Sequence, residues 1–179
     1  NRGDLRQCAI EPGQVSARTA LTPGQVLLRI DRFAFTANNV TYGAVGEMIG
    51  YWNFFPARDG WGRIPVWGFG EVVETRSPDV TVGERFYGYY PMATELVVVP
   101  GRADERSILD AAPHRAAMAS AYNRYQRCAA DPLHRAERED EQMLLYPLFF
   151  TSFVIDDFLA DNDDFGAEQV VISSASSKT

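Results

Sequence analysis

Short apolar segments separated by turn residues dominate the first hundred residues of the chain. A β-rich segment follows the turn signal Thr22-Pro23-Gly24, and the apolar segments in this region span 25–35, 66–75, 86–90 and 94–99. Gly68 and Gly70 inside the second segment indicate a bulge or a close approach of the backbone. Strands at this spacing are typical of a sandwich or a barrel.

The pattern changes near Arg106. Residues 111–130 are rich in alanine, arginine and methionine, which predicts a helix, and 135–142 is a charged run typical of a solvated helix face or loop. The apolar spacing between 150 and 158 predicts a second helix. Residues 169–172 have the composition of a buried strand. Because a lone strand after a helix makes no stable sheet, we expect the chain to be incomplete.

Composition narrows the classes of function. With 179 residues, the chain suits one domain, or one domain and a fragment. A net charge of −7 excludes general nucleic-acid binding, because like charges repel the phosphate backbone. The apolar run Leu144–Ile155 is too short to span a bilayer and contains Pro147, so we expect no membrane partner. Two isolated cysteines form no disulfide framework, and we predict a cytoplasmic protein.

Five segments, in order, resemble the opening domain of medium-chain dehydrogenases/reductases. Thr22–Ile30 resembles "PGEVLVRV", and the remaining matches are Ala37–Tyr42 with "NPVDTY", Ile64–Val73 with "PxxxGxExxGxV", Val82–Gly88 with "VGDRVYG" and Ala93–Pro100 with "AEYVVVP". The set is most similar to the zinc-free, quinone-oxidoreductase-like branch. Further segments resemble an uncharacterised bacterial branch of that superfamily: Gly50–Pro56, Tyr122–Tyr125 and Ser173–Thr179.

This resemblance implies an α+β fold, mainly β with helices. It divides the chain into a partly open GroES-like β-barrel with a helical insertion (1–148), a connecting helix (149–168) and the first part of a nucleotide-binding Rossmann domain (169–179). The resemblance also implies a homodimer formed through a C-terminal half that is absent from the chain.

The resemblance implies hydride transfer without zinc. Zinc-dependent members place a Cys at the exit of the first strand and a His-Glu pair after the glycine, where this chain has Phe35-Thr36 and Phe69-Gly70. We therefore expect no metal site. NADPH is the implied cofactor, bordered by Phe150 and Thr151 on the connecting helix. Its phosphates would meet a loop without glycine: Ser173, Ser174, Ala175, Ser176, Ser177, Lys178 and Thr179. The alternative for this loop is a tight strand-to-helix turn.

Tyr42 is the candidate catalytic residue, because the resemblance puts its turn near the nicotinamide. A phenol there would donate a hydrogen bond to a developing enolate oxygen or relay a proton; the alternative is aromatic packing. Thr36, Asn38 and Asn39 are candidates for the substrate pocket, although asparagine also caps helices. Tyr51, Trp52 and Phe69 are aromatic candidates for the pocket wall, and core packing is their alternative. We assign no role to His114 or His134.

Three hypotheses follow. The first is a zinc-independent NAD(P)H-dependent oxidoreductase that transfers hydride to an activated C=C bond or a quinone-type small molecule. The second is a non-catalytic binding or structural protein with the same fold, which the glycine-free loop favours. The third is a free-standing GroES-like barrel with a helical appendage. Binding of NADPH separates the first hypothesis from the second.

Overall fold

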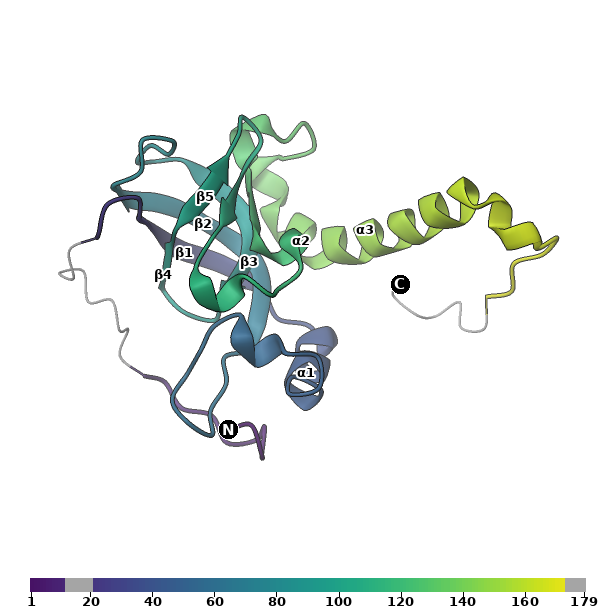
Figure 1. Cartoon of the computed structure of the whole chain (residues 1–179), viewed down its shortest axis with the longest axis horizontal. Helices are drawn as coiled ribbons and strands as arrows, with labels where there is room; N and C mark the ends of the chain where they lie inside the picture. Colours follow the sequence, from purple (N-terminus) through teal and green to yellow (C-terminus); the bar gives the residue numbers. More distant parts are fainter. Residues whose placement is uncertain (12–20, 173–179) are drawn as a thin grey trace.

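In the part of the chain that the structure describes, seven strands form one antiparallel sheet that curls into a half-barrel (Figure 1). The computed structural model describes residues 1–11 and 21–172. The strands cross the sheet in the order β4-β1-β2-β3-β7-β6-β5. Their bounds are β1 (Val26–Ala34), β2 (Pro65–Thr75), β3 (Arg85–Pro91), β4 (Glu95–Val98), β5 (Pro100–Ala103), β6 (Ser107–Asp110) and β7 (Arg124–Arg127). The predicted α+β class is confirmed.

The strands in the first hundred residues form where the apolar segments and turn signals predict them. Gly24, with φ of 85°, turns the chain into β1, and its amide donates a hydrogen bond to the carbonyl of Arg76. The predicted close approach at Gly68 is confirmed: a Cβ there would lie 2.4 Å from the carbonyl oxygen of Arg32 on β1. Only glycine therefore fits without a backbone shift.

Alternate side chains of these strands fill the interior of the half-barrel, as the two-residue period of a strand requires. The buried cluster comprises Val26, Leu28, Ile30, Val66, Val72, Val80, Phe86, Tyr90, Val98, Ile108 and Tyr125. The opposite face of β2 and β3 carries Trp67 and Phe69 in register with Tyr89 and Tyr87. This second face forms an aromatic layer that the helices partly cover.

The buried guanidinium of Arg115 links β6 to β7 by hydrogen bonds. Arg115 is 1% exposed and donates to the carboxylate of Asp110 at 3.0 Å, the hydroxyl of Tyr125 at 2.8 Å and the amide oxygen of Asn123 at 3.0 Å. It also donates to the carbonyl of Tyr122. Because these bonds replace the hydration that burial removes, the charge is tolerated in the interior.

Among the described residues, three α-helices accompany the sheet: α1 (Ala37–Ala44), α2 (Ser120–Asn123) and α3 (Glu139–Asp161). Single 3-10 turns lie at Tyr51–Asn53, Pro113–Arg115, Cys128–Ala130, Ala136–Arg138 and Asp163–Gly166. The first turns of α3 pack on β1 and β2, and the rest of the helix extends away from the half-barrel (Figure 1).

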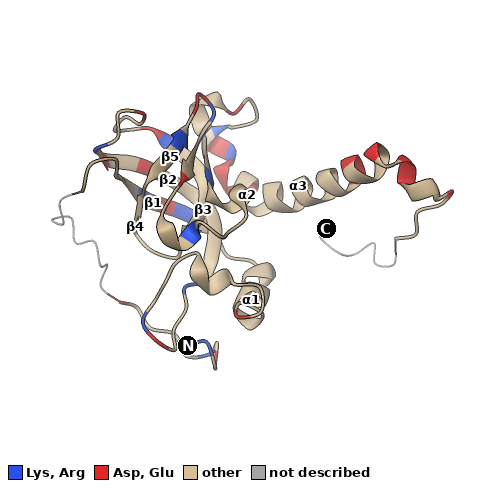
Figure 2. Cartoon of the chain, viewed as in Figure 1, with Lys and Arg blue, Asp and Glu red and all other residues tan. Residues whose placement is uncertain are grey.

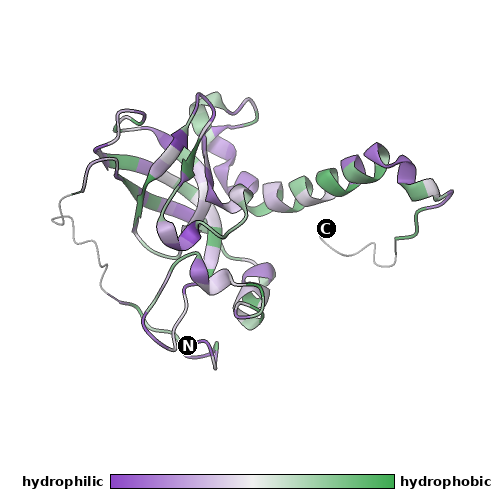
Figure 3. Ribbon diagram, viewed as in Figure 1, coloured by the Kyte–Doolittle hydropathy of each residue, from purple (hydrophilic) through white to green (hydrophobic). Residues whose placement is uncertain are grey.

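The extended part of α3 is apolar and exposed. Phe149, Phe153 and Phe158 are each more than half exposed, and apolar residues dominate the middle of the helix (Figure 3). Acidic residues gather at its far end (Figure 2). The helical stretch Ala136–Asp161 is long and apolar enough to cross a membrane by length and composition alone, whereas the sequence predicted a run too short to do so.

Two predicted elements are wrong. Residues 111–130 form no long helix: Arg124–Arg127 is strand β7, because Tyr125 is fully buried between β3 and β6 and long-range pairing outweighs local helix propensity. Gln169–Ile172 forms no strand, since no described segment pairs with it, and Val171 is 85% exposed. In addition, α3 begins at Glu139, before the expected boundary at 149.

Candidate functional site

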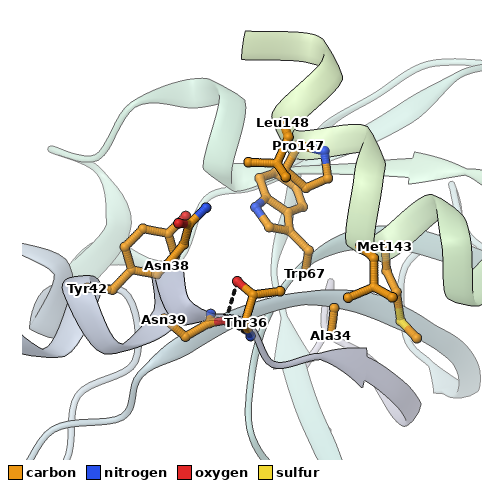
Figure 4. A pocket seen from close by; sticks show the side chains of 10 residues that line it. Ala34, Thr36, Asn38, Asn39, Tyr42, Trp67, Met143, Pro147 and Leu148 are labelled. Atoms are coloured by element: carbon orange, nitrogen blue, oxygen red, sulfur yellow. Dashed lines mark hydrogen bonds between the residues drawn. The ribbon is translucent and has the colours of Figure 1, made fainter. Parts of the chain in front are cut away.

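A small hollow lies where the end of β1, the start of α1 and the first turns of α3 meet (Figure 4). Its polar groups come from the β1–α1 segment, and α3 supplies one apolar side. The residues that line it are Ala34, Thr36, Asn38, Asn39, Tyr42, Trp67, Met143, Leu144, Pro147 and Leu148. The hollow therefore joins the half-barrel to the long helix.

The start of α1 is fixed by reciprocal bonds between Thr36 and Asn39. The backbone N–H of Thr36 donates to the Asn39 side-chain oxygen at 2.6 Å, and the Asn39 N–H donates to the Thr36 carbonyl at 3.0 Å. The Asn39 amide also donates to the carbonyl of Pro65 at 2.9 Å. Asn39 is 3% exposed, so the geometry supports helix capping, and not substrate binding, as its role.

Asn38 and Tyr42 are placed differently. Asn38 is exposed on α1, and Tyr42, one helical turn further on, is half-buried. Neither side chain forms a hydrogen bond with any other residue in the ranges 1–11 and 21–172. Burial, with a smaller effect of the nearby Tyr122, raises the pKa of Tyr42 above its usual value. Tyr42 therefore presents a neutral phenol that is able to donate a hydrogen bond.

The aromatic layer on β2 and β3, together with Tyr51 and Tyr122, packs behind this phenol. The ring of Tyr42 lies 5.0 Å from that of Tyr51 and 6.4 Å from that of Tyr89, measured between centroids. The Tyr51 hydroxyl donates to the Tyr122 hydroxyl at 3.1 Å. The Tyr89 ring lies 4.9 Å from that of Trp67, and its buried hydroxyl has no hydrogen-bond partner among the described residues.

Several predicted site residues do not line the hollow. Trp52 is 4% exposed and packs against the backbone at Gly46 and Gly62. Phe69 is fully buried in a cluster with Tyr87 and Met143, and Tyr51 lies in the layer behind Tyr42. Large aromatic side chains bury most area in a core, and here the core retains Trp52 and Phe69, while Tyr51 is partly buried and packs against it.

Of the predicted cofactor-binding residues, the structure describes only Phe150 and Thr151. Phe150 and Thr151 lie on the exposed part of α3, beyond the hollow; the Phe150 ring stacks on Tyr146, and the Thr151 hydroxyl donates to the Pro147 carbonyl at 2.8 Å. The serine-rich segment, Ser173 to Thr179, lies outside the described residues.

A charged cluster where α3 begins was missed at the sequence level. Glu139 is 3% exposed and accepts two hydrogen bonds from Arg85, both at 2.6 Å. His134 Nε2 lies 3.0 Å from the same carboxylate. Burial alone would raise the pKa of Glu139, but the bonds from Arg85 and His134 lower it below the usual value. Glu139 is therefore an ionised carboxylate held in the interior.

Fold and site together define the class: an α+β protein whose curled antiparallel sheet carries a polar, aromatic-backed hollow beside a long apolar helix. A family model described as "Protein of unknown function (DUF2855)" matches residues 33–179. Because this match covers most of the chain, the protein belongs to that family. No curated protein matches the chain.

Proposed function

We propose that the protein is a zinc-independent oxidoreductase of the medium-chain dehydrogenase/reductase class, which transfers hydride from NADPH to an activated C=C bond or a quinone-type substrate. The proposal rests on the hollow at the end of β1. The side chains of Asn38 and Tyr42 line this hollow and form no hydrogen bond with another described residue. The curled antiparallel sheet supports the GroES-like assignment. In the same proposal a Rossmann domain begins near residue 169, and Gln169–Ile172, which is unpaired among the described residues, would become its first strand only by pairing with other strands of that domain.

The chemistry of the lining residues suits the carboxamide of a nicotinamide or the carbonyl of a substrate. The Asn38 amide has both a donor and an acceptor, which matches a carboxamide, and Trp67 offers a flat apolar wall. The unpartnered Tyr89 hydroxyl lies in the layer directly behind. NADPH, when bound, supplies the hydride. In this arrangement Asn38 and Thr36 hold the carboxamide, and Met143, Pro147 and Leu148 of α3 exclude water.

Tyr42 is the residue that acts on the substrate in this proposal. Its neutral hydroxyl donates a hydrogen bond to the substrate oxygen on which negative charge develops as hydride arrives. Its raised pKa keeps the proton on the phenol at neutral pH, and the tilted ring of Tyr51 and the edge-on ring of Tyr89 hold its orientation. No metal is required for this step.

Titration of the full-length natural protein with NADPH, followed by cofactor fluorescence, tests the proposal. We expect saturable binding, and reduction of a quinone or enone panel by the loaded protein. Tyr42→Phe should lower kcat by about a hundredfold, the lower range for removal of an acid–base group. Tyr146→Phe makes the same chemical change outside the hollow and should leave kcat unaltered. Binding without turnover of any panel member would contradict the catalytic role.

The exposed apolar part of α3 favours a second candidate, a non-catalytic protein that binds a macromolecular partner. Apolar side chains around most of a helix are typical of a helix that is buried in a larger assembly. Absence of NADPH binding at millimolar concentration would favour this candidate over the oxidoreductase.

A further inference from the structure

Three side chains of metal-ligating type converge beside the aromatic layer. Cys128 opens the 3-10 turn after β7, Glu139 begins α3, and His134 lies in the loop between them. Their ligand atoms, one sulfur, one imidazole nitrogen and one carboxylate oxygen, all lie within 4.8 Å of one another. The three residues share no member with the hollow.

Two of the three ligating side chains are buried, and the third, His134, is partly exposed to solvent. Cys128 is 5% exposed and Glu139 is 3% exposed, whereas the side chain of His134 is 17% exposed. The His134 ring also packs near Phe69, with centroids 6.0 Å apart. An ion would therefore reach the cluster along the imidazole, while apolar side chains shield the thiol.

We propose that Cys128, His134 and Glu139 bind a zinc ion. Sulfur, nitrogen and oxygen donors in one cluster suit zinc, which accepts all three ligand types and imposes little geometric preference of its own. On binding, the Cys128 thiol releases its proton to solvent and the thiolate forms the metal–sulfur bond. Three protein ligands leave the fourth tetrahedral position to a water molecule at the His134 edge.

The guanidinium of Arg85 is compatible with this site. A carboxylate has about four acceptor positions, and Arg85 occupies one on each oxygen of Glu139. Arg85 also pairs with Asp31 at 3.0 Å, so its charge does not depend on Glu139 alone. Arg85 therefore acts as a positioning residue that orients the ligating carboxylate, as hydrogen-bonded partners of metal ligands commonly do.

The position of the site indicates its role. It connects the end of β7 to the first residue of α3, the two segments between which the chain leaves the half-barrel. Its three ligands are different residues from Phe35-Thr36 and Phe69-Gly70, which stand where zinc-dependent relatives by resemblance hold their catalytic ligands, although His134 packs against Phe69. The proposed ion would link these two segments and so fix the direction in which α3 departs. The inference is independent of the proposed oxidoreductase activity.

Titration of the reduced, metal-free chain with Co²⁺ tests the inference, because a thiolate ligand gives cobalt a near-ultraviolet charge-transfer band. We expect the band to saturate at one equivalent and to disappear when Zn²⁺ is added. Cys128→Ser should abolish it. His134→Gln should weaken cobalt binding by at least about tenfold, since loss of an outer-shell partner alone costs 10- to 100-fold.

Cys8→Ser is the matched control. Cys8 is the other free cysteine, exposed near the N-terminus, and its replacement should leave the cobalt band unchanged. His134→Gln changes a partly exposed loop residue, so it keeps the test decisive if Cys128→Ser does not fold. A melting temperature that rises with added Zn²⁺ in the unmodified chain would support the site. No thiolate band at millimolar cobalt, or a band lost in Cys8→Ser but retained in Cys128→Ser, would overturn it.

Discussion

The half-barrel buries its apolar side chains, whereas the outer part of α3 exposes them. In the half-barrel, Phe86 and Tyr90 are fully buried, and even the charged Arg115 has its hydrogen bonds satisfied inside. On α3, Phe149 and Phe153 are exposed by 63% and 54%. Because most helical stability in proteins comes from tertiary packing, the outer helix requires a covering surface, whereas the half-barrel already buries its apolar side chains. The two regions should respond differently to substitution.

The largest expected effect is in the interior of the half-barrel. Arg115→Ala leaves the Asp110 carboxylate and the Tyr125 hydroxyl without their buried partner, so the free energy of unfolding should fall by about 3–5 kcal/mol. Urea denaturation followed by tryptophan fluorescence measures this. Arg29→Ala removes an exposed arginine that pairs with Glu71 at 3.5 Å, and it should change stability little. Equal losses from both substitutions would contradict a self-sufficient interior.

Gly88→Ala tests how tightly the sheet packs. An added Cβ on β3 would lie 2.4 Å from the Tyr125 ring, which is itself held by Arg115 and by the carbonyl of Tyr89. Overpacking of this kind costs about 1–3 kcal/mol, readable as a lower midpoint in urea. Gly3→Ala, whose nearest neighbour lies 3.5 Å away, is the matched control. If Gly88→Ala is as stable as the control, the barrel interior is looser than the structure indicates.

The sequence predicts the strands of the first hundred residues well, because turn residues such as Pro23-Gly24 mark their ends. It fails at Tyr125, where an alanine- and arginine-rich neighbourhood favours a helix. The strand there depends on pairing with β3 and β6, and such long-range contacts leave no local signal. The helix over 150–158 is predicted correctly from its apolar spacing, but that spacing does not reveal that the face is exposed.

The candidate site is predicted in part for the same physical reason. Thr36, Asn38 and Tyr42 are close in sequence, so one strand exit and one helix turn bring them to the same hollow. Trp52 and Phe69 are buried instead, since an aromatic residue suits a core and a pocket wall equally well. His134 gave no signal, because its neighbours Cys128 and Glu139 meet it only after the chain has turned between β7 and α3.

A smaller effect is expected at the edge of the sheet, in the β5–β6 turn. Backbone N–H groups of Arg106 and Ser107 donate to Asp104 and lower the pKa of its carboxyl. A lowered pKa contributes stability above the unfolded value, and that contribution is lost as the pH falls through the folded value. Asp104→Asn should therefore lose less stability than the unmodified chain on acidification from about pH 5 to about pH 2.

Melting temperatures across this acidic range measure the Asp104 effect. Asp59→Asn, at an exposed carboxyl that bonds to no other described side chain, should follow the unmodified protein at every pH. An Asp104→Asn variant with an unchanged acid profile would show that the turn contributes nothing to the stability of the sheet edge.

The smallest effect on the free energy of unfolding is expected on α3. Phe149 and Phe153 stack on each other, with centroids 6.2 Å apart, and neither belongs to a buried cluster. Replacing both with Gln should change the unfolding free energy of the half-barrel by less than about 0.5 kcal/mol, as for surface positions generally. The same change should reduce self-association in sedimentation velocity, because it removes exposed apolar area. Ser152→Gln on the same helix should alter neither quantity. A loss of several kcal/mol in the double variant would mean that the outer helix is part of the barrel core, and the contrast between the two regions would then fail.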